Sequence, residues 1–311
     1  MVTRRTVLKT SSGLLPVSLA GCLDGSVDGT DTGVTRVVST FFTFYDFARH
    51  VAGDAAQVDS LVPLGEQGHG WEPSADVQRQ ANNADVFVYV GPGVQRWADN
   101  VVTNLRSDNP DVVIVNASDG IDLLPAAETE QRSRETDPHF WLDSTLAKHA
   151  VTNIRDGIQT ADEANEIAYR DNTEAYLDRL DDVDESFRDG LTPRRTNIAV
   201  VAGHNAYRYL ANRYEFEIFS PIGVTPDAAP SPRAIQQVQE IMDEHDLEYI
   251  LTPALESDRL ARELAQETDA DILTISPVAG QTDEWMDKDW GYLEQMLNVN
   301  LVSLKTALEA Q

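Results

Sequence analysis

Residues 197–204, Asn-Ile-Ala-Val-Val-Ala-Gly-His, indicate the fold class of this chain. The run Asn197–Ala202 is short, apolar and β-branched, which is typical of a strand buried on both faces of a parallel sheet. One glycine separates this run from His204, which precedes a helical pattern over Asn205–Arg213. Open parallel sheets bind ligands beyond the carboxyl ends of their strands. The stretch therefore predicts an α/β fold and places an imidazole at the edge where that fold binds ligands.

Similar apolar runs lie on both sides of this stretch and alternate with helical patterns. The eight predicted strands are Arg36–Ser39, Gln57–Val62, Asp85–Val90, Val112–Val115, Asn197–Ala202, Phe216–Phe219, Tyr249–Thr252 and Asp271–Ile275. Four strands before and four after a long interruption predict two doubly wound α/β lobes. We expect a binding site in the cleft between the two lobes.

The interruption is a polar-rich segment, Ser144–Leu191, with a helical pattern. Apolar residues recur in it at intervals of three, four or seven, which predicts one apolar stripe on a helix. The stripe consists of Tyr169, Tyr176, Leu180, Val183 and Phe187. Thr192-Pro193 ends the pattern, because proline cannot continue the hydrogen-bond ladder. We predict one long helix (144–191) that joins and packs on an N-terminal lobe (35–143) and a C-terminal lobe (192–311).

The N-terminus has the features of an export signal. Residues 1–21 carry Arg4, Arg5 and Lys9 and no acid, followed by a weakly apolar stretch, which is typical of a cleavable signal peptide. Thr3–Lys9 resembles a twin-arginine signal, and Leu19-Ala20-Gly21-Cys22 resembles a lipoprotein cleavage box. These resemblances imply a lipid on Cys22, a flexible tether over 22–34 and a location on the outer face of the cytoplasmic membrane. No later apolar run approaches the roughly 18 residues of a membrane span.

The charge of the chain excludes several partners. The 311 residues contain 24 Lys and Arg against 52 Asp and Glu, a formal net charge of -28. A nucleic-acid binder or a protein held on an anionic membrane surface needs the opposite balance. Acids spread along the chain with few Lys residues indicate salt adaptation, with an ordinary acidic protein as the alternative. The single cysteine excludes a disulfide framework.

Three of the six histidines lie in loops at points where a ligand site is expected. His69 stands in the turn-rich loop Pro63–Pro73, His139 in Asp137–Asp143, and His204 at a strand end. Three neutral imidazoles with one further ligand or a water molecule would complete a tetrahedral zinc site. The alternative is that the three are separate, solvated surface residues. The other histidines, His50, His149 and His245, fall in helical patterns and are interpreted as structural or surface residues.

Four segments, in order along the chain, resemble the zinc- and manganese-specific solute-binding proteins of ABC transporters. They are the segment around His69 followed by Ala84–Gly91, the segment Asp137–Asp143, the segment Gly203–Leu210, and Pro230-Ser231-Pro232-Arg233. The resemblance covers about Arg36 to Leu308. It implies that His69 and His139 from the first lobe and His204 from the second bind the metal. It also implies a monomeric receptor, not an enzyme, that delivers its metal to a membrane permease working with an ATPase.

The resemblance also indicates which metal is bound and leaves one ligand open. Its third position is His in zinc-type members and a carboxylate in manganese-type members, so His204 favours Zn²⁺, with Mn²⁺ or Fe²⁺ as alternatives. Many members place an Asp where this chain has Ser276. Water, Glu66, Asp283 and Glu284 are therefore the candidates for the fourth ligand. The histidine-rich loop of some zinc members is also missing, since Ala126–Thr136 carries acids, which we interpret as a solvated face.

The residues around the ligands suggest support for the site. Glu72 or Asp137 lies close enough along the chain to orient a metal-bound imidazole. The aromatic residues Trp71, Phe140, Trp141 and Tyr207 would either shield the site or belong to the ordinary core. By analogy with the family, we expect the long helix to limit lobe movement to a small closure.

Two other functions remain as alternatives at this point. A secreted zinc hydrolase would also use three histidines and an open position for water. The chain contains neither a His-Glu-x-x-His helix nor a Gly-x-Ser-x-Gly elbow, which argues against it. An adhesin that uses the same fold cannot be separated by sequence, because a fold does not determine a function.

Overall fold

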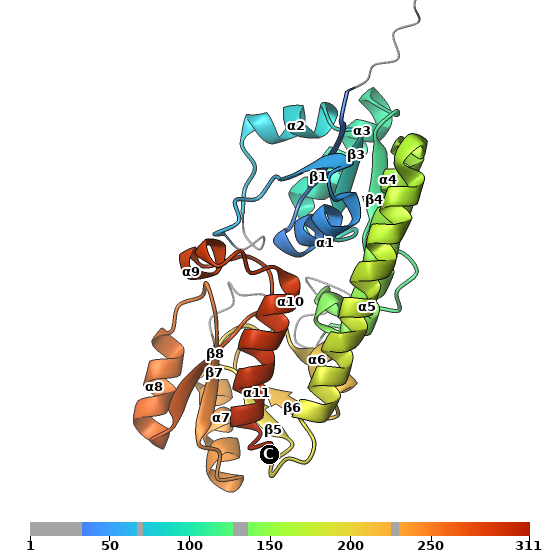
Figure 1. The fold of residues 1–311 in the computed structure, drawn as a ribbon. Coiled ribbons are helices and arrows are strands. Elements are labelled where there is room, and N and C mark those ends of the chain that lie inside the picture. Colours follow the sequence, from blue (N-terminus) through green and yellow to red (C-terminus); the bar gives the residue numbers. More distant parts are fainter. Residues whose placement is uncertain (1–32, 67–70, 127–135, 225–229) are drawn as a thin grey trace, which may run out of the picture. The chain divides into compact units, whose positions relative to one another are not determined.

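Parallel strands in two groups of four form the framework of the protein (Figure 1). The structure, a computed structural model, describes residues 33–66, 71–126, 136–224 and 230–311. The first sheet has the order β2-β1-β3-β4 and is parallel throughout. Its strands are β1 (Thr35–Ser39), β2 (Ala56–Ser60), β3 (Val86–Tyr89) and β4 (Val113–Asn116).

The second group of strands repeats this order. Two parallel pairs, β5-β6 and β7-β8, are joined by a parallel bridge between Val201 and Leu251, so the order in space is β6-β5-β7-β8. These strands are β5 (Ile198–Val200), β6 (Glu217–Phe219), β7 (Tyr249–Pro253) and β8 (Asp271–Ile275). All eight predicted strands are present to within a few residues, and the prediction of two α/β lobes is confirmed.

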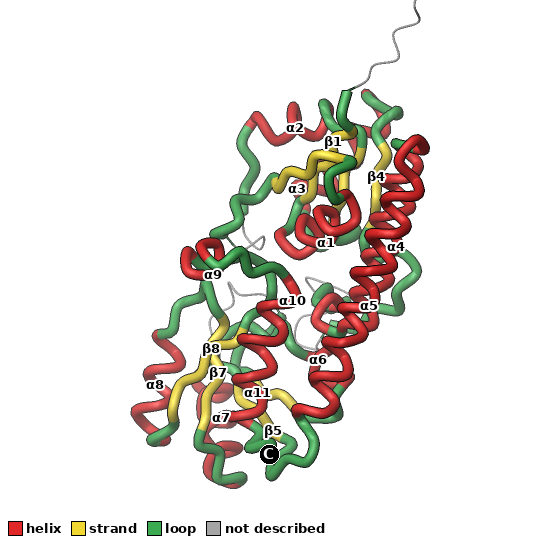
Figure 2. Tube along the Cα trace, in the orientation of Figure 1, coloured by secondary structure: helices red, strands yellow, loops and turns green. Residues whose placement is uncertain are grey.

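Helices cover both sides of each group of strands (Figure 2). The helices associated with the first sheet are α1 (Phe42–Ala52), α2 (Ala75–Asn82) and α3 (Arg96–Asp108). Those associated with the second are α6 (Arg208–Arg213), α7 (Pro232–Glu244) and α8 (Arg259–Thr268). The C-terminal part contains α9 (Asp283–Asp287), α10 (Tyr292–Gln295), the π-helical turn η3 (Met296–Leu301) and α11 (Val302–Ala307). Helix α6 begins three residues later than predicted, and the N–H of Asn205, in the loop before it, bonds to the carbonyl of Gly223 (2.8 Å).

The predicted single helix over 144–191 is wrong in one respect, because the segment forms two helices. Helix α4 (Ser144–Ala161) and helix α5 (Glu166–Gly190) are separated by Asp162 and the 3₁₀ turn η2 (Glu163–Asn165). Asp162 leaves the helical conformation, and its carboxylate accepts bonds from Asn165 (2.8 Å) and the Tyr169 hydroxyl (2.6 Å). Such side-chain bonds compete with the backbone ladder and end a helix. The predicted apolar stripe lies wholly on α5 and is buried.

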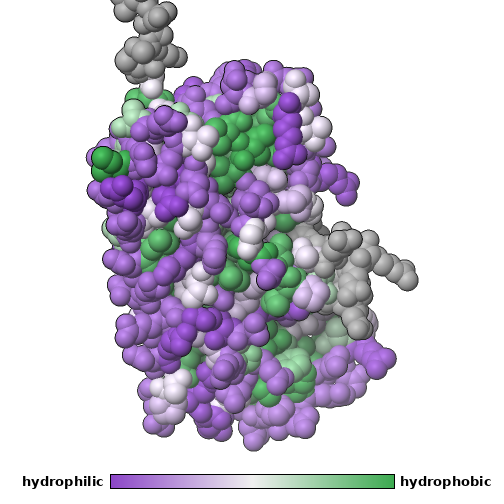
Figure 3. All heavy atoms as spheres, turned by 90° about the vertical axis from the view of Figure 1, so that its right-hand side faces the viewer, coloured by the Kyte–Doolittle hydropathy of each residue, from purple (hydrophilic) through white to green (hydrophobic). Residues whose placement is uncertain are grey.

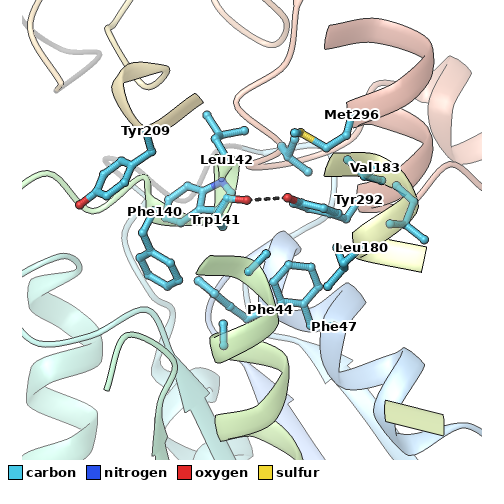
Figure 4. Packing of buried hydrophobic residues seen from close by; sticks show 14 of the residues in the cluster. Phe44, Phe47, Phe140, Trp141, Leu142, Leu180, Val183, Tyr209, Tyr292 and Met296 are labelled. Carbon is cyan, nitrogen blue, oxygen red and sulfur yellow. Dashed lines mark hydrogen bonds between the residues drawn. The ribbon is translucent and has the colours of Figure 1, made fainter. Parts of the chain in front are cut away.

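One core joins the two lobes. Each sheet has, on one face, a hydrophobic cluster that belongs to its own lobe (the private cluster of that lobe). This cluster is formed with α2 and α3 in the N-terminal lobe and with α7 and α8 in the C-terminal lobe. The other faces share a single cluster that takes in α1, α4, α5 and the C-terminal helices (Figure 4). Helix α5 contacts both α1 and the turn η3, so it lies along both lobes (Figure 1). The predicted long linking helix is therefore α5 alone.

The surface agrees with the acidic composition. Hydrophilic residues cover most of the face in Figure 3, and apolar residues gather in separate patches. Within the described part of the chain, no helix has both the length and the apolar character of a membrane span.

Candidate metal centre

His204 lies at the carboxyl end of the second sheet, as predicted, and is completely buried. Its Nδ1 bonds to one carboxylate oxygen of Glu256, and its backbone N–H donates to the other (3.2 Å). Gly203 allows this approach, because a Cβ there would lie 2.4 Å from the ring of Pro253 and 2.9 Å from Oε2 of Glu256. The carboxylate thus holds both the ring and the backbone of His204.

His139 is also completely buried and has a matching arrangement in the N-terminal lobe. It precedes the 3₁₀ turn η1 (Phe140–Leu142), and its Nδ1 (2.8 Å) and backbone N–H (3.1 Å) both bond to Oδ1 of Asp137. The other carboxylate oxygen of Asp137 accepts from the Arg208 guanidinium (3.3 Å). The backbone carbonyl of Asp137 accepts from the Tyr209 hydroxyl (2.7 Å). Residues of the C-terminal lobe therefore fix the segment that carries His139.

The two histidines meet although they come from different lobes. Their ring centres are 5.2 Å apart, with 48° between the planes. A carboxylate oxygen accepts hydrogen bonds, so a neutral imidazole that donates from Nδ1 presents Nε2 as the nitrogen able to bind a metal. A zinc ion about 2.1 Å from two Nε2 atoms at the tetrahedral angle places the ring centres about 5 Å apart. The spacing of His139 and His204 fits one shared zinc ion.

Other predicted site residues lie outside the part of the chain that the structure describes. His69, in residues 67–70, and Cys22, in residues 1–32, both fall there. Among the described residues, no group of three or more His, Cys, Asp and Glu side chains converges on one point. The described start of the loop that carries His69 contacts the C-terminal lobe, since the carbonyl of Leu64 accepts from the N–H of Gln281 (2.7 Å).

The candidates for the fourth ligand are now placed. Ser276 is buried, and its hydroxyl donates to Gln295 (2.6 Å) and accepts from the N–H of Val278 (2.9 Å). The π-helical turn brings Asn300 to the same place, where it binds the backbone of Ser276 on both sides (2.7 and 2.9 Å). Ser276 thus has a structural role. Glu66, Asp283 and Glu284 are exposed, and Glu284 bonds to Lys288 (2.6 Å).

The aromatic residues predicted near the site divide into two groups. Phe140, Trp141 and Tyr207 are fully buried, and the ring of Trp141 lies 5.2 Å from that of His139. Trp71 instead packs on Trp97 (5.1 Å) against the private cluster of the N-terminal lobe. Burial, and then the charge of Glu256, raise the pKa of the Tyr207 hydroxyl well above its usual value. Buried aromatic side chains therefore form part of the surroundings of the two histidines.

Sequence reasoning found Asp137 and missed Glu256. Asp137 was a candidate because it is two residues from His139, and the structure confirms the contact. Glu256 is 52 residues from His204 and three residues beyond the end of β7. The signal that identified His204, a polar residue just past the carboxyl end of a buried strand, applies equally to Glu256.

The comparison with known families decides what these features mean together. The family model described as the periplasmic component A of the zinc-uptake complex, ZnuA, matches residues 37–307. The chain belongs to the ZnuA family. This is the family that the sequence motifs indicated, a family of extracytoplasmic zinc-binding receptors of ABC transporters, and zinc is the metal of this uptake system.

Relatives of known name support the assignment. The chain is 29% identical to the high-affinity zinc uptake system protein ZnuA of Bacillus subtilis, over 97% of this chain and 99% of that protein. It is 28% identical to the zinc-binding lipoprotein AdcA of Streptococcus pneumoniae, over 90% of this chain and 57% of AdcA. The chain thus spans nearly all of the first relative and little more than half of the second.

Solved structures extend the likeness to three dimensions. The metal-dependent lipoprotein YcdH of B. subtilis superposes with a TM-score of 0.76 at 30% identity, over 88% of this chain and 99% of that one. Zn(II)-bound AdcA of S. pneumoniae gives a TM-score of 0.77 at 28% identity, over 90% and 59%. The laminin-binding protein Lbp of Streptococcus pyogenes gives 0.75 at 26% identity, over 88% and 98%. The ZnuA-type two-lobe fold predicted from the sequence is therefore confirmed.

Proposed function

We propose that this ZnuA-family protein captures one Zn²⁺ ion with His69, His139 and His204 and delivers it to an ABC permease with its ATPase. The observation that carries the proposal is the meeting of His139 and His204 from the two lobes, with ring centres 5.2 Å apart. Each ring is oriented by a carboxylate on Nδ1, the arrangement usual for metal-binding histidines. His69 is proposed as the third ligand on the family resemblance alone.

We propose water as the fourth ligand. Support comes from the contacts of the alternatives: the Ser276 hydroxyl is bonded to Gln295 and the Glu284 carboxylate to Lys288. A zinc-bound water is also what a hydrolase would use. Catalysis would need a general base as well, and the two carboxylates beside the described histidines, Asp137 and Glu256, already accept the Nδ1 protons. These contacts favour a carrier.

We further propose that the mature chain is a monomer attached to the outer face of the membrane by a lipid on Cys22. Residues 1–21 then act as the twin-arginine signal and residues 22–34 as the tether. The names of relatives such as the AdcA lipoprotein support this proposal. The domain limits 35–143, 144–191 and 192–311 are part of the same proposal.

Metal titration of the purified, metal-stripped protein tests the proposal. We expect one Zn²⁺ per chain. The ratio of its affinity to that of Mn²⁺ should exceed the ratio that ordinary nitrogen and oxygen ligands give for these two metals. Separate His69→Ala, His139→Ala and His204→Ala substitutions should each weaken zinc binding by more than about 100-fold, exceeding the loss caused by changing a neighbour of a ligand. His149→Ala is the matched control, since this histidine is exposed on α4.

Each outcome distinguishes a part of the proposal. Tighter Mn²⁺ binding would keep the receptor and overturn the metal. Unchanged zinc binding in the His139→Ala and His204→Ala variants would overturn the site. Release of product from an ester or peptide panel, dependent on the same histidines, would replace the carrier by a hydrolase.

A further inference from the structure

A buried carboxylate lies where the two lobes join, away from the metal centre. Asp46 is on α1 of the N-terminal lobe and is 2% exposed. Its Oδ2 accepts from the backbone N–H of Tyr292 (3.0 Å), the first residue of α10, and from the Tyr176 hydroxyl of α5 (3.4 Å). A Cβ at residue 291 would lie 2.6 Å from Oδ1 of Asp46, so the close approach requires Gly291. One side chain therefore connects α1, the linking helix and the C-terminal helices.

The charges around Asp46 compensate it poorly. The facing groups are Arg49 and His50 on α1, Tyr176 and Arg179 on α5, and Tyr292 and Glu294 on α10. Among the described residues, the ion pair found for Asp46 is a long one, 3.8 Å to Nε2 of His50, whereas Arg179 pairs with Glu294 (3.3 Å). A buried carboxylate without a close cation is costly, and any opening that readmits water relieves this cost.

The pKa values of the two partners agree with this geometry. Burial, the largest cause, raises the pKa of Asp46 despite the opposing effects of His50, the Tyr292 N–H and Arg49. Burial likewise lowers the pKa of His50 despite the opposing charge of Asp46. A carboxyl whose pKa is raised in the packed state contributes stability below its ordinary pKa and loses that contribution as the pH rises through the raised value. The join between the lobes is therefore weaker when Asp46 is charged than when it is protonated, and it weakens as the pH rises through the raised pKa.

The join between the lobes, that is the contact of Asp46 on α1 with Tyr292 on α10, is connected to the segment that carries His139. The Tyr292 hydroxyl donates to the carbonyl of Trp141 (2.6 Å), two residues after His139 (Figure 4). The indole N–H of Trp141 donates to the carbonyl of Pro277 (2.8 Å), and the hydroxyl of Thr43, on α1, donates to the carbonyl of Val278. The residue whose N–H is bound by Asp46 thus also holds the backbone beside a proposed metal ligand.

We propose that Asp46 is a positioning residue for metal release, whose buried charge keeps the join between α1 and α10 able to loosen. Loosening shifts Tyr292 and with it the carbonyl of Trp141, which moves His139 away from His204. The inference rests on the proposed function, because the cargo is the zinc ion held by these histidines. Asp46 acts through Tyr292 and does not touch the metal.

Asp46→Asn tests the inference, because the amide has the same shape and carries no charge. Zinc release to a chelator is followed by stopped flow between pH 5 and pH 8. We expect zinc release from the variant to be slower than from the original protein at the high-pH end of the series, by up to about tenfold. The ratio of the two rates should approach one as the pH falls, because protonation of Asp46 removes the charge from the original protein. Asp54→Asn, an exposed acid just after α1, is the control for the loss of one charge.

Two further measurements separate positioning from general stability. In a Tyr292→Phe background, which removes the bond to Trp141, the effect of Asp46→Asn on release should disappear. Thermal unfolding of the metal-free protein should still show a higher Tm for Asp46→Asn at the high-pH end of the series and a difference that shrinks as the pH falls. Faster release or a lower Tm at the high-pH end of the series would overturn the inference. If the original protein binds no zinc, the proposed function fails, and the Tm series alone still tests the charge at the join.

Discussion

His139 and His204 are held by carboxylates in two different ways. Asp137 belongs to the same short segment as His139, is completely buried and is also bound by Arg208 and Tyr209. Glu256 comes from a separate loop, has a side chain 13% exposed, and lines a pocket of about 710 Å³. The Asp137 carboxylate is therefore enclosed by protein. The Glu256 carboxylate has protein on one side and the pocket on the other. The N-terminal, Asp137 half of the candidate centre therefore has the more firmly held carboxylate, and we call it the rigid half with respect to the bond between carboxylate and histidine; the C-terminal, Glu256 half is the adaptable half in the same sense.

The largest effect is expected at the rigid half. Asp137→Asn removes the charge that orients His139 and leaves Arg208 without its carboxylate. We expect zinc affinity to fall toward the upper end of the 10- to 100-fold range usual for such neighbours of a ligand, that is by about 100-fold. Loss of a charged hydrogen bond should also lower the free energy of unfolding by about 1.5–3 kcal/mol. Calorimetric titration and urea unfolding measure the two effects, with the exposed Asp119→Asn as control. An unchanged affinity would show that Asp137 only supports the fold.

A smaller effect is expected at the adaptable half. Glu256→Gln keeps a hydrogen-bond acceptor for His204 in a side chain that solvent reaches. We therefore expect a loss of zinc affinity of about tenfold, the lower end of the same range, with little change in the free energy of unfolding. The same two measurements apply. A loss larger than that of Asp137→Asn would reverse the comparison and make Glu256 the main support of the centre.

The smallest effect is expected from the exposed acids proposed as alternatives to water. Glu66→Gln, Asp283→Asn and Glu284→Gln should each change zinc affinity by less than about twofold, because surface charges act weakly through solvent. Competition with a chromophoric chelator resolves changes of this size. A tenfold loss in any one of them would identify that residue as the fourth ligand and end the proposal of a water molecule.

The sequence was sufficient for the features that depend on local pattern. The eight strands follow from short buried runs, and the stripe from Tyr169 to Phe187 follows from helical spacing. The break at Asp162 was missed, because both flanking segments have helical patterns and only the side-chain bonds of Asp162 end the first helix. Glu256 was missed for a different reason: its partner is distant in sequence, and the two meet only once β5 and β7 are neighbours. Because both groups of strands have the same order, residues just past the ends of β5 and β7 can in principle be predicted to lie side by side.

The shared core has a consequence for the order in which the chain folds. Thr43 bonds to Val278, 235 residues away, and Asp46 bonds to Tyr292, 246 residues away. Contacts between such distant residues form late, because closing a long loop costs conformational entropy. The N-terminal lobe is made first, and α1 packs on α4 and α5, but the bonds of Asp46 and Trp141 to Tyr292 can form only when the last twenty residues have been synthesised. The last contacts of the N-terminal half therefore form only after the C-terminal helices have been made, and a chain truncated before Tyr292 lacks them.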